Sequence, residues 1–335
     1  MKIVIDAFGG DKAPFEIVKG AVSAVQLYDI EIILTGKEDE IKKCLETLAY
    51  TGDKITIVNC SEVITNDDVP TEAIKQKTDS SLVKAFDLLK DKDVAGLISA
   101  GSTGAILTGS FLKVGRIRGI SRPCLSPVLP TQNGGVVVLA DAGANVDCKP
   151  INVCHFALLA TTYCKAVLGI ENPRVALLNI GTEDKKGNEF TKECFGLLKE
   201  MKEINFVGNM EARDFLSGKY DVVVADGFYG NILLKASEGA VSFALKQIKQ
   251  EIKSSFWAKI GAFFMMGAFK KIKSKLNTSN YGGSPFLGVK KIVIKSHGSS
   301  DSLAILRCVE QLMKMENNKF IETIASNFPS VNIEE

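Results

Sequence analysis

Six short runs of aliphatic residues constrain the fold of this chain more than any other feature, because each leads directly into a turn of glycine and polar residues. They are Ile3–Ile5, Val94–Ile98, Val136–Leu139, Val175–Leu178, Val222–Val224 and Ile292–Ile294. Runs without polar alternation are typical of strands that are buried on both faces. Two further strands are expected at Ile30–Leu34 and Ile55–Val58, and helix-like stretches separate the strands. This alternation predicts a mostly parallel sheet covered by helices.

The expected fold is therefore a doubly wound, three-layer α/β/α structure. No repeat, low-complexity tract or clear linker divides the 335 residues, so we predict one domain over residues 1–335. A two-lobed form of the same body is an alternative, with the proline-rich segment SRPCLSPVLP (121–130) as its crossover. Residues 238–280 are expected to form a helical pair that protrudes from this body.

The six turns are the expected location of a functional site. In an open parallel sheet, ligands bind beyond the carboxyl ends of the strands, where these turns would lie. Glycine lets backbone N–H groups approach a ligand closely, and the start of a helix favours an anion. The segment Gly101–Gly104 is the best expected phosphate cradle, followed by His297–Ser300.

A structural explanation competes with this functional one. Small polar residues after a strand commonly cap the helix that follows, and here they are Asp6, Ser102, Asp141, Asp226 and Ser299. Capping is the better explanation for any single turn. Six turns of one kind at one end of a sheet favour a functional role for some of them.

Several other kinds of site are not supported. The chain has no G-x-G-x-x-G, no G-x-x-x-x-G-K-[ST] and no G-x-S-x-G, which argues against a dinucleotide fingerprint, a P-loop and a hydrolase elbow. Its eight scattered cysteines show no C-x-x-C pair and no zinc spacing, so we expect reduced, buried thiols in the cytoplasm. Asp6 interrupts the apolar stretch that an export signal would need.

Only His155 and His297 could act as imidazole bases. His155 lies in the helix-like apolar run NVCHFALLATTYC, which is typical of a hydrogen-bonded core residue. His297 follows a strand and precedes Gly-Ser-Ser-Asp, so it is the better catalytic candidate.

At the same turns the sequence resembles the bacterial phosphate acyltransferases of phospholipid synthesis. The resemblance covers nearly the whole chain in order, through IDAFGGD (5–11), KTDSSL (77–82), SAGSTGA (99–105), DAGANVDCKP (141–150), LLNIGTEDKKGNE (177–189), DGFYGNILLKASEG (226–239) and YGGSPFLGVKKIVIKSHGSSD (281–301). The family pattern differs at a few positions, namely Phe8, Ser102, Ala140, Ala225 and Ser296. The resemblance implies a fold related to isocitrate and isopropylmalate dehydrogenases and phosphotransacetylases, and a homodimer.

The reaction implied by the resemblance is attack of inorganic phosphate on the thioester of an acyl carrier protein, which gives acyl phosphate. A membrane-bound glycerol-3-phosphate acyltransferase would then consume this product. Phosphate is itself a nucleophile at neutral pH, so the reaction needs no activated Ser or Cys, no metal and no cofactor. It needs a positioned phosphate, donors for the tetrahedral oxyanion and assistance to thiolate departure.

Expected roles follow for specific residues. The catalytic candidates are His297, Lys235 and Asn231, with Lys235 and His297 supplying positive charge and His297 also a proton donor to sulfur. Substrate contacts are expected from Asp6, Gly9, Gly10, Gly101, Ser102, Thr103, Gly104, Asn145, Asn179, Gly181, Glu183, Asp226, Gly227, Gly298 and Ser299. A solvated helix residue is an equal alternative for Lys235.

Two other functional classes remain open at this point. The carboxylates at the turns, including Asp11, could hold Mg²⁺, as in a metal-dependent decarboxylating dehydrogenase on the related fold. A non-catalytic lipid-binding protein would bind acyl chains without turnover. Full activity in EDTA without nicotinamide would favour acyl transfer over the dehydrogenase. Turnover with acyl carrier protein would favour it over the lipid-binding protein.

The segment FWAKIGAFFMMGAFKKIKSKL (256–276) combines apolar and basic residues. Its uncharged stretch Ile260–Phe269 would span only about 15 Å as a helix, which is too short to cross a bilayer. We expect one helix over Val241–Lys259 and a returning helix over Lys270–Leu276, with Gly261 and Gly267 marking the turn. Contact with an anionic membrane is expected from Trp257, Phe263, Phe264, Met265, Met266, Phe269, Lys270 and Lys271.

The positive charge of residues 246–275 indicates that this region has a function of its own. Residues 246–275 carry eight lysines and one glutamate, whereas the whole chain has a net charge of only +2. The remainder is mildly acidic, which argues against nucleic acid as a partner. The lysines could equally guide an acidic carrier protein, and the apolar residues could form a dimer interface. We expect a cytoplasmic protein that associates peripherally with the membrane.

Overall fold

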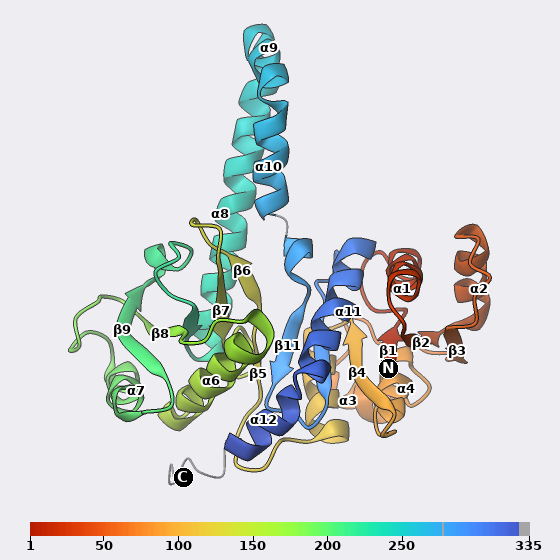
Figure 1. The fold of residues 1–335 in the computed structure, drawn as a ribbon, viewed down its shortest axis with the longest axis horizontal. Helices are drawn as coiled ribbons and strands as arrows, with labels where there is room; N and C mark the ends of the chain where they lie inside the picture. The colour runs from red at the N-terminus through yellow and green to blue at the C-terminus, as the bar shows by residue number, and fades with distance from the viewer. Residues whose placement is uncertain (277, 328–335) are drawn as a thin grey trace.

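The computed structural model of the protein describes residues 1–276 and 278–327. Its strands form two sheets, not the single sheet expected from the sequence (Figure 1). The first has the order β3 (Ile55–Asn59), β2 (Glu31–Gly36), β1 (Lys2–Asp6), β4 (Val94–Ser99), β12 (Ile292–Lys295), β11 (Ser284–Leu287), β5 (Cys124–Leu125). The second has the order β6 (Val128–Pro130), β7 (Val136–Ala140), β10 (Val222–Val224), β8 (Arg174–Asn179), β9 (Asn205–Glu211). The observed arrangement is the two-lobed form.

Most neighbouring strands are parallel, as predicted. In the first sheet β3, β2, β1, β4 and β12 run parallel, whereas β11 is antiparallel to both of its neighbours. In the second sheet β6 is antiparallel to β7, and the other pairs are parallel. All eight strands expected from the sequence coincide with observed strands, to within two residues at either end. The short strands β5, β6 and β11 and the strand β9 were not expected.

The chain passes from the first sheet to the second through the proline-rich segment 121–130. This segment contains β5 of the first sheet and β6 of the second, so it is the crossover of the two-lobed alternative. The chain returns through α8 (Gly227–Ser254), α9 (Phe256–Phe264) and α10 (Met266–Leu276) before it enters β11. The six predicted turns are therefore divided, with three turns in each sheet.

Helices cover both faces of each sheet. The helices that follow the first-sheet strands are α1 (Phe15–Leu27), α2 (Glu38–Thr47), α3 (Pro70–Gln76), α4 (Ser81–Leu88), α5 (Thr103–Gly109) with its π-helical extension η1 (Ser110–Val114), α11 (Ser302–Asn317) and α12 (Phe320–Asn327). Those of the second sheet are α6 (Pro150–Tyr163) with η2 (Cys164–Leu168), α7 (Glu189–Glu200), and α8, which follows β10 and whose base packs on the opposite face. Short 3₁₀ turns lie at η3 (Ala212–Asp214) and η4 (Thr278–Tyr281). Alternate residues of β1 pack against opposite layers: Ile3 and Ile5 join the cluster of α1 and α11, and Val4 joins that of α4.

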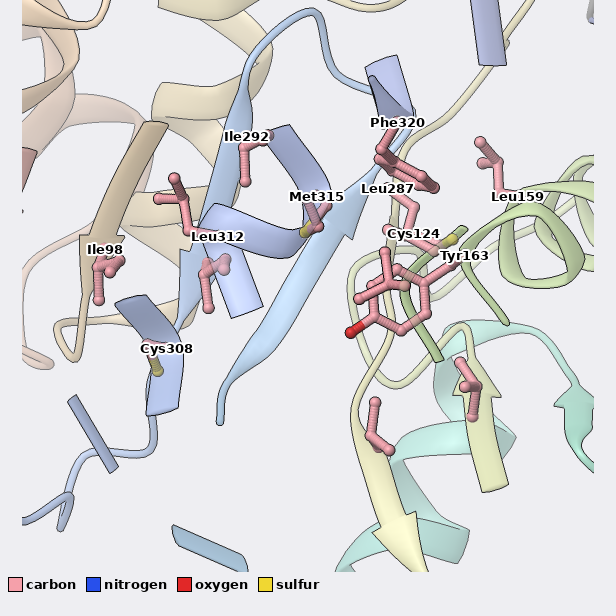
Figure 2. Close-up of a cluster of buried hydrophobic side chains, with 14 of the residues drawn as sticks. Ile98, Cys124, Leu159, Tyr163, Leu287, Ile292, Cys308, Leu312, Met315 and Phe320 are labelled. Atoms are coloured by element: carbon pink, nitrogen blue, oxygen red, sulfur yellow. The ribbon is translucent and has the colours of Figure 1, made fainter. Parts of the chain in front are cut away.

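A shared apolar core joins the two sheets, as Figure 2 shows for part of it. Tyr163 of α6 meets Phe320 of α12 edge to face, with ring centroids 5.8 Å apart. The Tyr163 hydroxyl also accepts a hydrogen bond of 2.7 Å from Gln311 of α11. The stretch Pro150–Leu168 is long and apolar enough to cross a membrane by composition, but 78% of it is buried inside the protein. It is therefore the central core helix.

The helical protrusion differs from its predicted boundaries. α8 begins at Gly227 and ends at Ser254, and Ser255 caps the next helix, so the first helix is longer than expected and breaks before Lys259. The backbone is extended at Ser255, between α8 and α9, whereas helical hydrogen bonds continue through Met265 from α9 into α10, and Gly261 and Gly267 both lie inside helices. Figure 1 shows α8 and α10 side by side, with α9 at the far end.

Candidate functional site

Three glycine-containing turns meet at the carboxyl ends of β1, β4 and β12. A Cβ atom on Gly9 would lie 2.5 Å from the Gly101 amide nitrogen, so only glycine permits this approach. Gly10 adopts a φ of +97° and lies close to Gly298, and the Asp11 amide donates to the Gly298 carbonyl at 2.7 Å. The turn after each strand is therefore held against the other two.

A buried carboxylate beneath these turns fixes their geometry. The Asp6 carboxylate accepts hydrogen bonds from the Ser99 hydroxyl at 2.7 Å and from the Phe8 amide at 3.2 Å. The same Ser99 oxygen accepts from the Gly101 amide at 3.0 Å. Burial raises the pKa of Asp6, although these hydrogen bonds oppose the shift. Asp6 thus supports the turns from below and does not line the pocket above them.

A pocket of about 380 Å³ opens above the three turns. Its lining includes seven residues predicted to be in the site, which are Gly10, Gly101, Ser102, Thr103, Lys235, His297 and Gly298. Phe8, Asp11, Ala100, Lys295 and the loop 63–66 complete the wall. Lys235 comes from α8 and the other predicted residues from the first sheet, so elements of both sheets contribute. Gly9, Gly104 and Ser299 flank this lining.

Three basic side chains face this pocket. Loss of solvent lowers the pKa of Lys295 to about 8, and the nearby positive charge of Lys235 acts in the same direction. Partial burial also lowers the pKa of His297, with smaller contributions from Lys235 and Lys295. The Lys235 ammonium pairs with Glu238 at 2.8 Å. Lys235 and His297 are exposed and Lys295 is half-buried, so the pocket presents its positive groups to an anionic ligand that enters from solvent.

His297 has a defined tautomer when neutral. Its Nδ1 atom lies 3.2 Å from the Ser299 backbone nitrogen and 2.8 Å from the Ser299 hydroxyl. A backbone N–H can only donate, so Nδ1 is the acceptor and Nε2 carries the hydrogen. The neutral ring therefore presents an N–H donor on the side away from Ser299.

Lys295 was missed by the sequence reasoning. It is the last residue of β12, whose other residues are buried, and its ammonium donates to the Ser296 carbonyl. Its position in the sequence could have identified it as a candidate, because a lysine directly follows only one of the six aliphatic runs. The loop 63–66 carried no such signal, since no strand or glycine pattern marks it.

The turn after β7 uses its polar groups internally. The buried Asp141 carboxylate accepts from the amides of Leu125, Ala144 and Asn145 and from the Asn145 side chain, at 2.7–3.1 Å. The Asn145 side chain also donates to the Pro123 carbonyl at 2.7 Å. Burial raises the pKa of Asp141. These two residues connect the turn to the crossover.

The remaining second-sheet candidates lie outside the pocket lining. Asp226 caps α8 by accepting from the Tyr229 amide at 2.8 Å, and burial raises its pKa. The Gly227 amide donates to the Asn145 carbonyl at 2.8 Å. Asn179 donates to the Lys186 carbonyl and to the Asn209 side chain, both at 3.1 Å.

The other three candidates of this group occupy different settings. Gly181 and Glu183 lie in the turn after β8, where the exposed Glu183 carboxylate is 3.9 Å from Lys186. Asn231 is exposed on α8, one turn before Lys235 and beside Gly143. Of the second-sheet residues, Asn231 is thus the one on the same helix face as a pocket residue.

His155 lies in the core, as predicted. It is buried in α6, and its Nδ1 atom is 3.2 Å from the Ser121 hydroxyl.

The cysteines are free thiols, seven of them buried and Cys148 half-buried. Among the described residues, no group of three or more His, Cys, Asp or Glu side chains is arranged to hold a metal ion.

Comparison with known proteins identifies the family of this chain. The profile of a family described as "Fatty acid synthesis protein" matches residues 1–323. A putative phosphate acyltransferase from Clostridium perfringens is 47% identical over 322 residues, covering 96% of this chain and 95% of the relative. A phosphate acyltransferase from Alkaliphilus oremlandii is 47% identical over 335 residues, covering 100% and 99%. The chain belongs to the phosphate acyltransferase family. It is an acyltransferase of fatty acid or phospholipid synthesis.

Solved structures support the fold. A phosphotransacetylase from Streptococcus pyogenes has a TM-score of 0.58 at 18% identity, covering 96% of this chain and 94% of that one. A 4-hydroxythreonine-4-phosphate dehydrogenase from Klebsiella pneumoniae has a TM-score of 0.52 at 13% identity, covering 94% and 99%. At these identities the likeness concerns the fold alone. The expected relation to phosphotransacetylases is confirmed.

Replacing Ser99 by Ala should destabilise the protein at neutral pH. The variant loses the hydroxyl donor to a buried carboxylate, which costs about 1.5–3 kcal/mol in the free energy of unfolding. The folded pKa of Asp6 is already raised, so the deficit should be largest above that pKa and should shrink as acid protonates the carboxyl. Chemical denaturation at pH 7 and pH 5 measures both effects.

Ser23 provides the matched control. Its exposed hydroxyl donates to the Lys19 carbonyl within α1, so Ser23→Ala should change the free energy of unfolding by less than about 0.5 kcal/mol. Equal effects of the two substitutions would show that Ser99 does not support the turns.

Proposed function

We propose that this protein transfers an acyl group from the thioester of acyl carrier protein to inorganic phosphate. A phosphate oxygen forms the new bond to the carbonyl carbon, the carbon–sulfur bond breaks, and the carrier thiolate takes up one proton. The products are acyl phosphate and free carrier thiol. The observation that carries this proposal is the pocket in which Lys235, Lys295 and His297 face glycine-rich turns. The membership of the family supports the acyl-transfer chemistry.

Phosphate binding is proposed at the start of α5. The first N–H groups of a helix have no acceptor within the helix and favour an anion. Ser102 and Thr103, at this helix start, line the pocket together with Gly10 and Gly298. Lys235 and Lys295, which also line the pocket, would balance the phosphate charge.

Lys295 is proposed to deliver the proton to sulfur. A pKa of about 8 lies close to that of a simple thiol, about 8–9, so proton transfer between the two would be nearly balanced. His297 has a lowered pKa, which favours the neutral ring at pH 7. We therefore assign His297 the role of an Nε2–H donor to the tetrahedral oxyanion, in place of the cationic role expected from the sequence.

The other proposed substrate contacts are secondary. Asn231, one turn from Lys235, is available to the thioester arm. Gly9, Gly104 and Ser299 would shape the rim, whereas Asp6, Asp141, Asp226 and Asn145 would act through the turns that they hold. The dehydrogenase alternative has no support from the relatives, which are phosphate acyltransferases.

The protrusion is proposed to contact an anionic membrane. Trp257 and Phe264 are 78% and 81% exposed, and Phe263, Met265 and Met266 are exposed with them. Lys270 and Lys271 follow on α10, and Phe269 is half-buried. Aromatic and Met side chains next to lysines suit the membrane interface, where each lysine adds about 1 kcal/mol.

The protrusion also supports a proposal for the oligomeric state and for the place of the protein in the cell. Exposed Phe243, Leu245 and Ile248 on α8 support a homodimer through the protrusion. A peripheral position on the cytoplasmic membrane would place acyl phosphate near the membrane-bound glycerol-3-phosphate acyltransferase that uses it.

The direct test is product formation. Purified protein, acyl carrier protein thioester and labelled phosphate should give labelled acyl phosphate, with undiminished rate in EDTA and without nicotinamide. Release of fatty acid without labelled acyl phosphate would contradict the proposal. So would binding of the donor without turnover.

The pH profile should identify Lys295. In the wild type, kcat should fall above pH about 8 as the Lys295 ammonium loses its proton. Lys295→Arg keeps the positive charge but cannot release a proton in this range, so kcat should fall by about 10²-fold and the alkaline limb should disappear. His297→Ala is the control, because it should lower kcat and retain the limb. An unchanged limb in Lys295→Arg would exclude Lys295 as the acid.

Membrane contact should depend on the far end of the protrusion. Phe263→Glu together with Phe264→Glu should abolish co-sedimentation with anionic liposomes, because the apolar anchor is replaced by charges that anionic lipid repels. Ile180→Glu, at another exposed apolar residue, should leave co-sedimentation unchanged. Equal sedimentation of the Phe263/Phe264 variant and wild type would refute the contact.

A further inference from the structure

A second pocket, of about 500 Å³, lies beside α5 and is larger than the phosphate pocket. Its apolar wall consists of Leu107, Phe111 and Leu112, and its basic rim of Lys75, Arg116 and Arg122. We call these six residues the arginine groove. Phe111 and Leu112 are 45% and 51% exposed, and adjacent large apolar residues that are exposed together can mark an interaction site.

The charged side chains that line the arginine groove are all positive. No Asp or Glu occurs between residues 94 and 140, and no carboxylate lines the groove. Three of the chain's six arginines lie within residues 116–122. Among the residues that the structure describes, none of these three arginines forms an ion pair, whereas Arg174, Arg213 and Arg307 each pair with a carboxylate. The groove therefore presents uncompensated positive charge.

The basic rim is preorganised. The Arg116 guanidinium lies over the Phe111 ring, 5.0 Å from its centroid, and donates to the Ser121 carbonyl. Ser121 in turn accepts from the Asn152 side chain at 2.6 Å, which ties the loop to α6. An arginine fixed by stacking loses less side-chain entropy when it meets an anionic partner.

The groove adjoins the proposed phosphate pocket. Thr103 lines the phosphate pocket and Leu107, one turn later on α5, lines the groove. One helical turn advances about 5.4 Å, so the two pockets lie on successive turns of one helix. Asn145 closes the groove on the side of the second sheet, and its carbonyl accepts from Gly227 at the start of α8.

We propose that the arginine groove is the docking surface for the acidic protein that carries the acyl thioester. This inference rests on the proposed function and names where its protein substrate binds. Carboxylates of the carrier meet Lys75, Arg116 and Arg122, and an apolar contact covers Phe111 and Leu112. The thioester arm then extends along α5 toward the phosphate pocket. Charge complementarity of this kind speeds encounter and fixes the orientation of the partner.

Charge reversal at the rim tests the proposal. Lys75 and Arg122 are exposed, so the double variant Lys75→Glu, Arg122→Glu should fold normally. It should raise the KM for acyl carrier protein thioester at least tenfold and leave the KM for phosphate unchanged. The wild-type KM should also rise with ionic strength more steeply than that of the variant, because salt screens the lost attraction.

A matched control separates this surface from the lysines of the protrusion. Lys246→Glu with Lys249→Glu on α8 changes the net charge equally and should leave the KM for the carrier thioester unchanged. A larger effect of this control than of the groove variant would overturn the proposal. An equal rise in KM with a small acyl thioester that lacks the carrier protein would also overturn it, because the groove would then hold the acyl arm itself.

Binding without turnover distinguishes this inference from the proposed function. Fluorescence anisotropy of labelled, unacylated carrier protein should give a Kd that is at least tenfold weaker for the groove variant and unchanged for the control. Such a result supports the docking surface even if labelled acyl phosphate fails to form. Undetectable binding to wild type, or equal Kd values for wild type and the groove variant, would overturn the docking surface and leave the product assay as a separate test.

Discussion

The close approach of three turns at the ends of β1, β4 and β12 is the constraint on which the pocket depends. Gly9 touches the Gly101 amide, and any Cβ there would separate the turns. The Ser99 hydroxyl links the buried Asp6 carboxylate to the same amide, so the contact is fixed from below. Because the turns are locked together, the start of α5 and the side chains of Lys295 and His297 share one small volume. No single turn could provide this set of groups.

The basic groups of the pocket have an energetic consequence. Burial lowers the pKa of Lys295 and of His297, and the nearby positive charge of Lys235 lowers both further. An anion in the pocket would reverse this effect and raise the pKa of Lys295. Ligand binding and protonation would then be coupled, so that in the proposed reaction phosphate would favour the protonated Lys295 that is proposed to protonate the departing sulfur.

Much of the fold could be predicted because it depends on local patterns. Buried strands are recognisable as aliphatic runs, and Pro-rich 121–130 marks the crossover. The sequence offered the division into two sheets only as an alternative to a single sheet, since strand pairing depends on contacts distant in sequence. The same limit applies to the site. Lys235 reaches the pocket from the other sheet, whereas Asp141, Asn145 and Asn179 use their polar groups to shape turns. A capping residue and a ligand-binding residue look alike in sequence, and only the three-dimensional contacts separate them.

The long helix α8 joins two regions that have different surroundings. Lys235 lies near its base, and about 30 Å of continuous helix separates that residue from Ser254. If lipid binds the far end of the protrusion, the pocket lined by Lys235 lies at a distance from the bilayer surface. The acyl phosphate of the proposed reaction would then have to cross an aqueous gap with its hydrocarbon tail shielded, either by tilting of the whole molecule or by direct transfer to the acyltransferase proposed to use it. The length of α8 thus sets the distance between the pocket and the membrane over which the product would have to travel.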